Sequence, residues 1–333
     1  MTVVMKSPFT GKDMEIVYEV RSWNFRGEQY EYMHTAYRCV DTGEQFTSEE
    51  MEEAAYLQVT NQYRIKYGLP FIDEIADVRN RYGLSAAKMA QIMGFGINQW
   101  RNYESGEVPS VSNGRMIRSI ARPDVFLDYV ESSRNVLGEK DYAKIRAKVE
   151  AQIDESGFPD RAVYDLFRVY QCDRGLDNGY AQLSLPHLKN VLLYILSKCG
   201  EVFYTKMNKL LFYADFVSYR RHGVAMTGLS YRALTYGPVP EKWKNVYSQF
   251  DEIIHESRFY GDKEGCVLVA GAAPNLDSLS LEDINVLDEV CARFAECNSV
   301  DMTEISHKEQ AWLENVDGHK RIPFAAAFKL KAL

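Results

Sequence analysis

Motifs of the commonest enzyme classes are missing from this 333-residue sequence. It contains no HExxH, GxxxxGKS/T, GxGxxG or GxSxG stretch, so the usual signatures of zinc proteases, phosphate-binding loops, dinucleotide-binding folds and α/β-hydrolases are absent. The six histidines lack the spacing of metal ligands, and the six cysteines form no CxxC pair. We therefore expect no catalytic activity, no cofactor, and cysteines that are small buried hydrophobes in a reducing compartment.

Long hydrophobic runs are missing as well. The longest apolar stretches, such as VLLYIL at 191–196, are far too short to span a bilayer. The first residues, MTVVMKSPFTGKDM, have no apolar segment of the kind that a signal peptide needs. These observations predict a cytoplasmic protein that has no membrane partner.

The composition that is present is typical of globular proteins, with 46% hydrophobic and 26% charged residues. The length allows two or three domains. The net charge of −8 means that the chain as a whole is not a general binder of polyanions. Any nucleic-acid site must therefore be a local basic patch on an acidic protein.

Residues 1–65 predict a small antiparallel β domain that leads into a helix. The segments MEIVYEVRSW and QYEYMHTAYRCV are rich in Val, Ile and Tyr and are bounded by glycine-containing turns. Two stretches, SPFTG and CVDTG, have the outline of zinc knuckles, but only Cys39 remains, and hydroxyls stand in the other places, at Ser7, Thr10 and Thr42. Because hydroxyls are poor zinc ligands, we expect no metal here.

Residues 68–131 predict five short helices. Two of them, SAAKMAQIMG and INQWRNYESG, are joined by a tight GFG turn, which indicates a helix-turn-helix. Between positions 79 and 122 there are seven basic residues against two acidic ones, a local charge of +5. This inversion of charge is the pattern expected of a surface that faces phosphates.

The polar side chains of this region suit DNA. The start of the second helix of such a motif enters the major groove, where arginine pairs with guanine, and asparagine or glutamine with adenine. We predict base contacts from Asn98, Gln99, Arg101 and Asn102. Small hydroxyl and basic residues are predicted to contact phosphates, namely Ser85, Lys88, Ser110, Ser112 and Arg115. The alternative is an ordinary solvated helix with polar residues by chance.

The rest of the chain predicts a helical connector over 132–183, whose helix can pack on either neighbour, and a last domain over 184–333. In that domain, LPHLKNVLLYILSKCG and TKMNKLLFYADFVSYRRHG place apolar residues at helical core spacing. GLSYRALTYGPVPEKW alternates and carries a Gly-Pro turn, which indicates a short strand or hairpin. The fold expected for the whole chain is mainly α with small β elements.

The first half resembles a known family. GFGINQWRNYESGEVPS, with its aromatic-Glu-x-Gly ending at Tyr103–Gly106, resembles the recognition segment of XRE/Cro-type proteins. Together with the knuckle outline, residues 5–130 resemble MqsA-type antitoxins, in which a zinc-binding, toxin-facing domain is joined to an XRE-type DNA-binding domain. Because the zinc ligands are missing, the zinc function is not implied.

The last domain resembles the Panacea, or SocA-like, family over about residues 185–300, most specifically in KLLFYAD and YGPVP. The resemblance implies a domain that neutralises toxins of many kinds, and one relative acts as a proteolytic adapter. The residues that it implies for toxin contact are Tyr213, Asp215, Tyr219, Tyr231, Tyr236, Gly237, Pro238 and Val239. The alternative is that the tyrosines are core residues, that Asp215 caps or pairs locally and that YGPVP is only a turn.

The two resemblances together imply an antitoxin that grips a cognate toxin and represses its own operon as a homodimer on a palindromic operator. Two alternatives remain open. One is a transcription regulator that senses a ligand or protein without any toxin. The other is an adapter that delivers a bound toxin to a protease.

Overall fold

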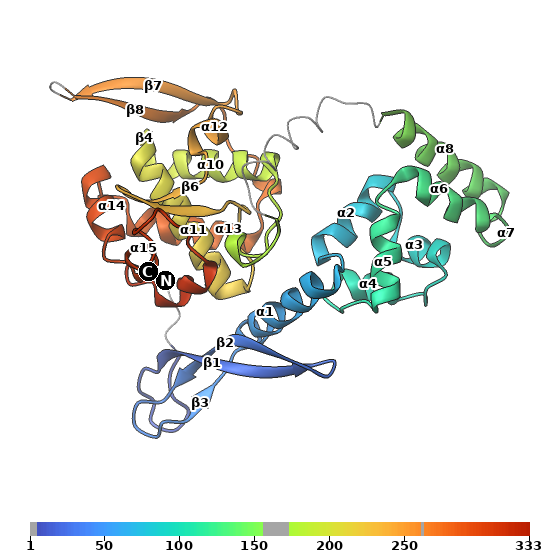
Figure 1. Cartoon of the computed structure of the whole chain (residues 1–333), viewed down its shortest axis with the longest axis horizontal. Helices are drawn as coiled ribbons and strands as arrows, with labels where there is room; N and C mark the ends of the chain where they lie inside the picture. The colour runs from blue at the N-terminus through green and yellow to red at the C-terminus, as the bar shows by residue number, and fades with distance from the viewer. Residues whose placement is uncertain (1–4, 156–172, 261–262) are drawn as a thin grey trace. The chain divides into compact units, whose positions relative to one another are not determined.

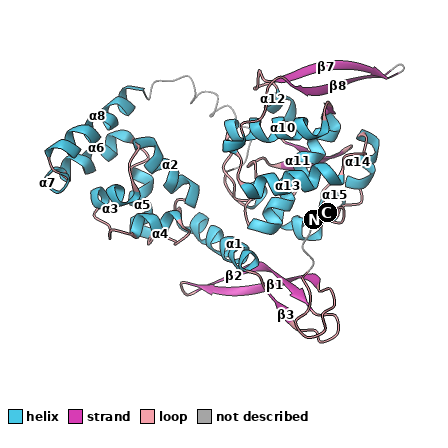
Figure 2. Cartoon of the chain, turned by 180° about the vertical axis from the view of Figure 1, so that it is seen from behind, coloured by secondary structure: helices cyan, strands magenta, loops and turns pink. Residues whose placement is uncertain are grey.

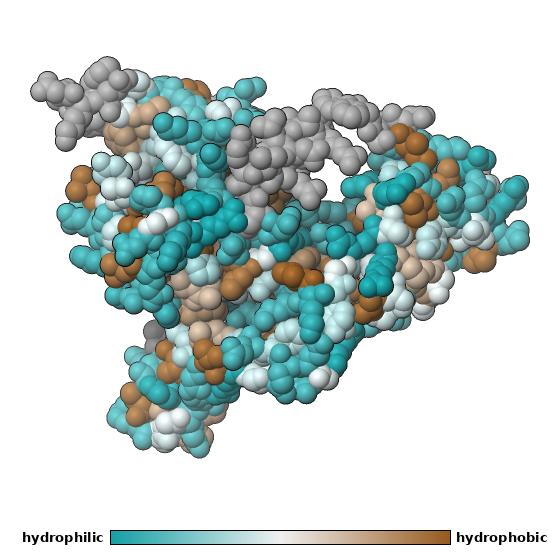
Figure 3. Space-filling view, viewed as in Figure 1, coloured by the Kyte–Doolittle hydropathy of each residue, from teal (hydrophilic) through white to brown (hydrophobic). Residues whose placement is uncertain are grey.

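The computed structural model describes residues 5–155, 173–260 and 263–333, and it is mainly helical with small antiparallel sheets (Figures 1 and 2). This confirms the expected fold class. Contacts group the chain into two compact units, one made of Met1–Val59 with Leu166–Leu333 and the other of Thr60–Asp165. The face seen in Figure 3 is largely hydrophilic, with apolar residues scattered over it.

The first unit begins with an antiparallel sheet of order β1-β2-β3, made of β1 (Glu15–Phe25), β2 (Glu28–Arg38) and β3 (Gln45–Phe46). β1 and β2 are joined by Arg26 and Gly27, both with positive φ (53° and 86°), as expected of a two-residue hairpin turn. Helix α1 (Glu49–Tyr67) follows and continues into the second unit from Thr60. Acidic residues in its first turn lie at the positive end of the helix dipole, where negative charge is stabilising.

The two stretches SPFTG and CVDTG form turns beside one sulfur, that of Cys39. Ser7 Oγ donates to Cys39 Sγ at 3.1 Å, and Thr10 Oγ1 lies 3.9 Å from the same sulfur. Hydrogen bonds from Ser7 and Thr42 lower the pKa of the buried Cys39 thiol to about 6. Among the described residues, no three His, Cys, Asp or Glu side chains are grouped so as to hold a metal.

The second unit is a bundle of short helices. Its elements are α2 (Ile72–Tyr82), α3 (Ala86–Met93), α4 (Gln99–Glu104), α5 (Val111–Ser119), α6 (Pro123–Ser132), α7 (Arg134–Leu137) and α8 (Glu139–Glu155). The first five confirm the five helices predicted within 68–131. The helix predicted for the connector, α8, packs on this unit, because its Tyr142, Ile145 and Val149 belong to the same buried cluster as Trp100 of α4.

The C-terminal part of the first unit is built around one buried helix. Its helices are α10 (Leu185–Cys199), α11 (Tyr204–His222), α12 (Trp243–Tyr247), α13 (Leu281–Arg293), α14 (Ser299–Ser306) and α15 (Gln310–Leu313). Its strands are β4 (Val202–Phe203), β5 (Tyr231–Leu234), β6 (Gly237–Pro240), β7 (Ile253–Tyr260) and β8 (Lys263–Ala270). Every residue of α11 from Met207 to Tyr219 is buried, so this helix is surrounded by protein on all sides.

The burial of the cysteines agrees only in part with the expectation that all of them are buried. Cys39 and Cys291 are buried as expected, whereas Cys199, Cys266 and Cys297 are only half-buried. Cys172 lies outside the described residues.

None of the helices in the described ranges combines the length and the apolarity needed to cross a membrane.

Candidate functional site

The helix-turn-helix predicted from the sequence falls on α3 and α4. Ser85 begins α3, and its hydroxyl accepts a hydrogen bond from the Lys88 amide at 3.2 Å. The helix ends at Gly94, whose φ of 69° turns the chain into the GFG connection. On α4, Trp100 and Tyr103 are buried, whereas Arg101 is exposed. The short helix α4 therefore has a polar side that faces solvent and an aromatic side that is buried.

The aromatic-Glu-x-Gly ending holds the fold. Glu104 Oε1 accepts from Arg79 Nε at 2.6 Å and from Trp100 Nε1 at 3.0 Å. The carbonyl of Gly106 accepts from the fully buried Arg64 guanidinium at 3.1 Å. These hydrogen bonds fix the backbone at the C-terminal end of α4, so the solvent-facing residues of α4 are held in a fixed position.

The nine predicted DNA-contact residues lie on α3, α4 and α5 or on the residues that begin them. The exposed ones are Ser85, Asn98, Arg101, Asn102, Ser110, Ser112 and Arg115. The half-buried pair is already engaged, because the Gln99 amide donates to Glu107 at 2.8 Å and Lys88 Nζ pairs with Asp141 at 2.9 Å. The hydroxyls of Ser85 and Ser110 accept from the backbone at the start of α3 and α5, and Ser110 also bonds to Ser112 at 3.1 Å. The nine residues therefore lie on neighbouring elements, and several of them already have partners within the chain.

Four of the residues implied for toxin contact lie in the core instead, at Tyr213, Asp215, Tyr219 and Tyr231. The Asp215 carboxylate accepts from the Thr227 amide at 2.7 Å and from the Tyr231 hydroxyl at 2.5 Å, and burial raises the pKa of Asp215 to about 6. The Tyr213 hydroxyl donates to buried Glu309 at 3.2 Å. Direct contact of these side chains with a partner does not fit this placement, because three of them lie on the buried helix α11 and Tyr231, on β5, is itself fully buried.

The YGPVP stretch forms the turn and second strand of the β5–β6 hairpin. Tyr236, in the two-residue turn, is 72% exposed, whereas Gly237, Pro238 and Val239 are buried. A Cβ on Gly237 would lie 2.6 Å from Ser306 Oγ, and the φ of Gly237 is 105°. Only glycine fits this position well, so the glycine of the YGPVP motif is required first of all by the fold.

A groove of about 630 Å³ opens beside this hairpin. Its lining residues are Arg232, Leu234, Val239, Pro240, Glu241, Lys242, Trp243, Lys244, Asn245 and Arg321. Val239 is the one member of the set implied for toxin contact that lines it. Four lining side chains are cationic and one is anionic, which gives a local charge of +3 on a chain of net charge −8.

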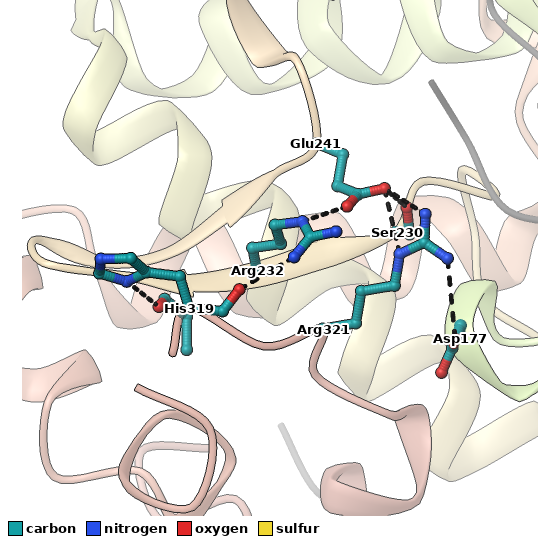
Figure 4. Close-up of polar contacts among 7 residues, drawn as sticks. Asp177, Ser230, Arg232, Glu241, His319 and Arg321 are labelled. Atoms are coloured by element: carbon teal, nitrogen blue, oxygen red, sulfur yellow. Dashed lines mark hydrogen bonds and ion pairs between the residues drawn. The ribbon is translucent and has the colours of Figure 1, made fainter. Parts of the chain in front are cut away.

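The Glu241 carboxylate lies between two guanidiniums in this groove (Figure 4). Arg232 of β5 donates to one oxygen, and Arg321 donates to the other at 2.7 Å; Ser230 adds a hydroxyl donor at 3.1 Å. Burial alone raises the pKa of Glu241, but the hydrogen bonds and charges of Arg321 and Arg232 outweigh it, and the net pKa is below its ordinary value. Glu241 is therefore an ionised carboxylate with an internal partner on each side.

The hairpin and the chain after α15 hold the two arginines in place. Arg232 and Arg321 face each other across an antiparallel bridge, and the Ala233 amide donates to the Lys320 carbonyl at 3.1 Å. The Arg232 guanidinium also donates to the His319 carbonyl at 3.0 Å. Backbone pairing therefore brings the two arginine residues side by side, and the shared Glu241 carboxylate holds their guanidiniums.

Sequence reasoning did not identify the residues of this groove other than Val239. A signal was present in the letters EKWK, which place three charged residues around a tryptophan directly after YGPVP. Arg321 gave no such signal, because it reaches Glu241 across 80 residues of sequence.

Residues 207–313 match the family model of the SocA-like antitoxin, Panacea domain. The match agrees with the resemblance expected of the C-terminal part and supports an antitoxin-related role. The Panacea match begins at Met207 within α11 and contains the β5–β6 hairpin and α12, and it leaves out Arg321 and the helices α3 and α4. No curated protein and no solved structure matches the chain.

Proposed function

We propose that this protein is an antitoxin that neutralises a partner toxin by direct binding through its Panacea domain and represses its own operon through α3 and α4. The observation that carries the proposal is the match of residues 207–313 to an antitoxin family. The exposed Arg101 and Asn102 on a firmly anchored α4, in a locally basic stretch, support the DNA-binding part. A single helix-turn-helix reads few base pairs, so the proposal includes a homodimer on a palindromic operator.

Co-expression with the products of neighbouring genes tests neutralisation. We expect one small neighbouring open reading frame to arrest growth when expressed alone and to be tolerated together with this protein. The two products should then copurify. If no neighbouring product is toxic, or if a toxic one is not relieved, the antitoxin assignment is wrong.

Replacement of Arg101 by alanine tests the DNA-binding part. Arg101 is exposed, so its loss should leave the fold intact and weaken specific binding to the promoter about tenfold to a hundredfold, as expected for one base-contacting arginine. The measurement is a mobility shift with the protein's own promoter fragment against an unrelated duplex. Arg146→Ala, at an exposed arginine of α8, is the matched control. Equal binding by the two variants would contradict the role of α4.

A further inference from the structure

We propose that the groove beside β5 and β6 binds an acidic segment of the partner protein, with carboxylates against its cationic side chains and an apolar side chain against Trp243. This inference rests on the proposed function and names the chemistry of the partner segment. It is argued from the charge of the groove, from the carboxylate already held there and from its apolar floor.

The charge of the groove opposes that of the whole chain. Arg232 and Arg321 remain 44% and 33% exposed at their side chains although both contact Glu241, and Lys242 and Lys244 are exposed. Four cations on one concave surface attract negatively charged groups, although the chain as a whole has a net charge of −8. The surface therefore selects an anionic partner.

Glu241 shows which anion the groove suits. Its carboxylate fits between the guanidiniums of two arginines that face each other across a backbone bridge, and each oxygen receives at least one N–H donor. Planar guanidiniums arranged in this way are suited to carboxylates. Other N–H groups of the two guanidiniums are engaged within the chain as well, since Arg232 donates to the His319 carbonyl at 3.0 Å and Arg321 Nη1 lies 4.0 Å from the Asp177 carboxylate. An incoming carboxylate would therefore meet mainly the exposed ammonium groups of Lys242 and Lys244, with the two arginines adding positive charge beside it.

The floor of the groove favours a peptide over a nucleic acid. Leu234 and Trp243 are half-buried in its lining. Trp243 is held by Tyr204, with ring centroids 5.0 Å apart, and Lys244 Nζ lies 5.4 Å from the centroid of its ring. A fixed aromatic ring beside a small hydrophobic surface is the kind of anchor that binds an apolar side chain at protein interfaces.

Charge reversal at the two lysines tests the inference in the full-length protein. The probes are a fluorescein-labelled peptide of glutamates flanking leucine, its glutamine counterpart and a labelled single-stranded oligonucleotide. We expect the glutamate peptide to bind more tightly than the glutamine peptide. Lys242→Glu with Lys244→Glu should weaken its binding about tenfold or more. The neutral pair Lys242→Gln with Lys244→Gln should fall between the reversed pair and the wild type.

The control carries the same change of charge outside the groove, as Lys308→Glu with Lys331→Glu, both exposed. It should bind the glutamate peptide as the wild type does, and thermal melts should show all three variants folded. No preference for glutamate over glutamine, or equal binding by the reversed pair and the control, would overturn the inference. The inference would also be overturned if the charge reversal at Lys242 and Lys244 weakened binding of the oligonucleotide more than it weakened binding of the glutamate peptide.

The same variants in the co-expression assay separate the two proposals. If the wild type relieves a toxic neighbour and the reversed pair does so equally well, the groove is not the binding surface, and the antitoxin assignment stands. If the wild type relieves no neighbour, the antitoxin assignment fails whatever the peptide measurements show.

Discussion

At Glu241, burial and ion pairing act on one carboxyl group in opposite directions. Only 7% of its side chain is exposed, which disfavours the charged form, while Arg321 and Arg232 favour it and prevail. The pKa of Glu241 is thus lower in the folded chain than in the unfolded chain. Its ionised form therefore stabilises the fold at neutral pH, and this contribution is lost as the pH falls through the folded-state pKa.

This sign predicts how Glu241→Gln behaves with pH. The variant should unfold more easily than the wild type near neutral pH, by about 1 kcal/mol, because both guanidiniums also reach solvent. The difference should shrink as the pH falls below about 4.5, the ordinary pKa of the group. Urea unfolding across this range measures it, with Glu304→Gln at an exposed position as the control. A difference that grows toward acid pH would show that the sign is wrong.

Residue roles in the core could not be predicted from the sequence. Tyr213 and Tyr231 were implied as contact residues by resemblance, and nothing local distinguishes an aromatic ring on a protein surface from one in a core. Their burial depends on the packing of α11 against α13, α14 and β6, which are distant in sequence. The alternative in which these tyrosines are core residues fits the structure.

At the scale of elements, the β5–β6 turn sets the shape of the groove wall. The two-residue turn Thr235–Tyr236 fixes the register that pairs Leu234 with Gly237 and Arg232 with Val239. Because side chains alternate between the two faces of a strand, this register decides which residues line the groove. A substitution in the turn should therefore change both the free energy of unfolding and the set of side chains that line the groove.

Gly237→Ala tests this turn. The φ of 105° and a Cβ 2.6 Å from Ser306 Oγ and 2.9 Å from Lys209 Cε predict destabilisation of about 1–3 kcal/mol. Gly96→Ala is the control, because a Cβ there has no neighbour within 4 Å, and its effect should stay within about 1 kcal/mol. Urea denaturation midpoints compare the two. Equal midpoints would mean that the turn tolerates a side chain.

Elements were predicted well wherever the signals were local. The cap at Ser85, the glycine turn after α3 and the apolar spacing of α10 and α11 all lie within one or two turns of the residues that they organise. The sequence does not predict which neighbour α8 packs on, because an amphipathic helix does not specify which surface will cover it. The site at Glu241 was missed for the same reason, since it joins residues from β5, from the end of β6 and from beyond α15.

At the scale of the whole molecule, two regions of positive charge lie in different compact units. One is the stretch from 79 to 122 in the unit Thr60–Asp165, and the other is the groove. Both stand out against a net charge of −8, so each should attract anions locally and with strong dependence on salt.

The placement of the two regions in different compact units predicts that the two proposed activities can be removed one at a time. Lys242→Glu with Lys244→Glu should leave promoter binding unchanged, whereas Arg101→Ala should leave relief of the toxic neighbour unchanged. Mobility shifts and co-expression on both variants measure this. A loss of both activities in either variant would show that one surface serves both tasks.

The internal carboxylate of the groove also matters when nothing is docked. Each guanidinium there has its counter-ion within the same chain, so folding does not wait for another protein to neutralise it. If the groove binds a partner as proposed, its charged surface is already in place before the encounter, and the same ion pairs remain after the partner leaves.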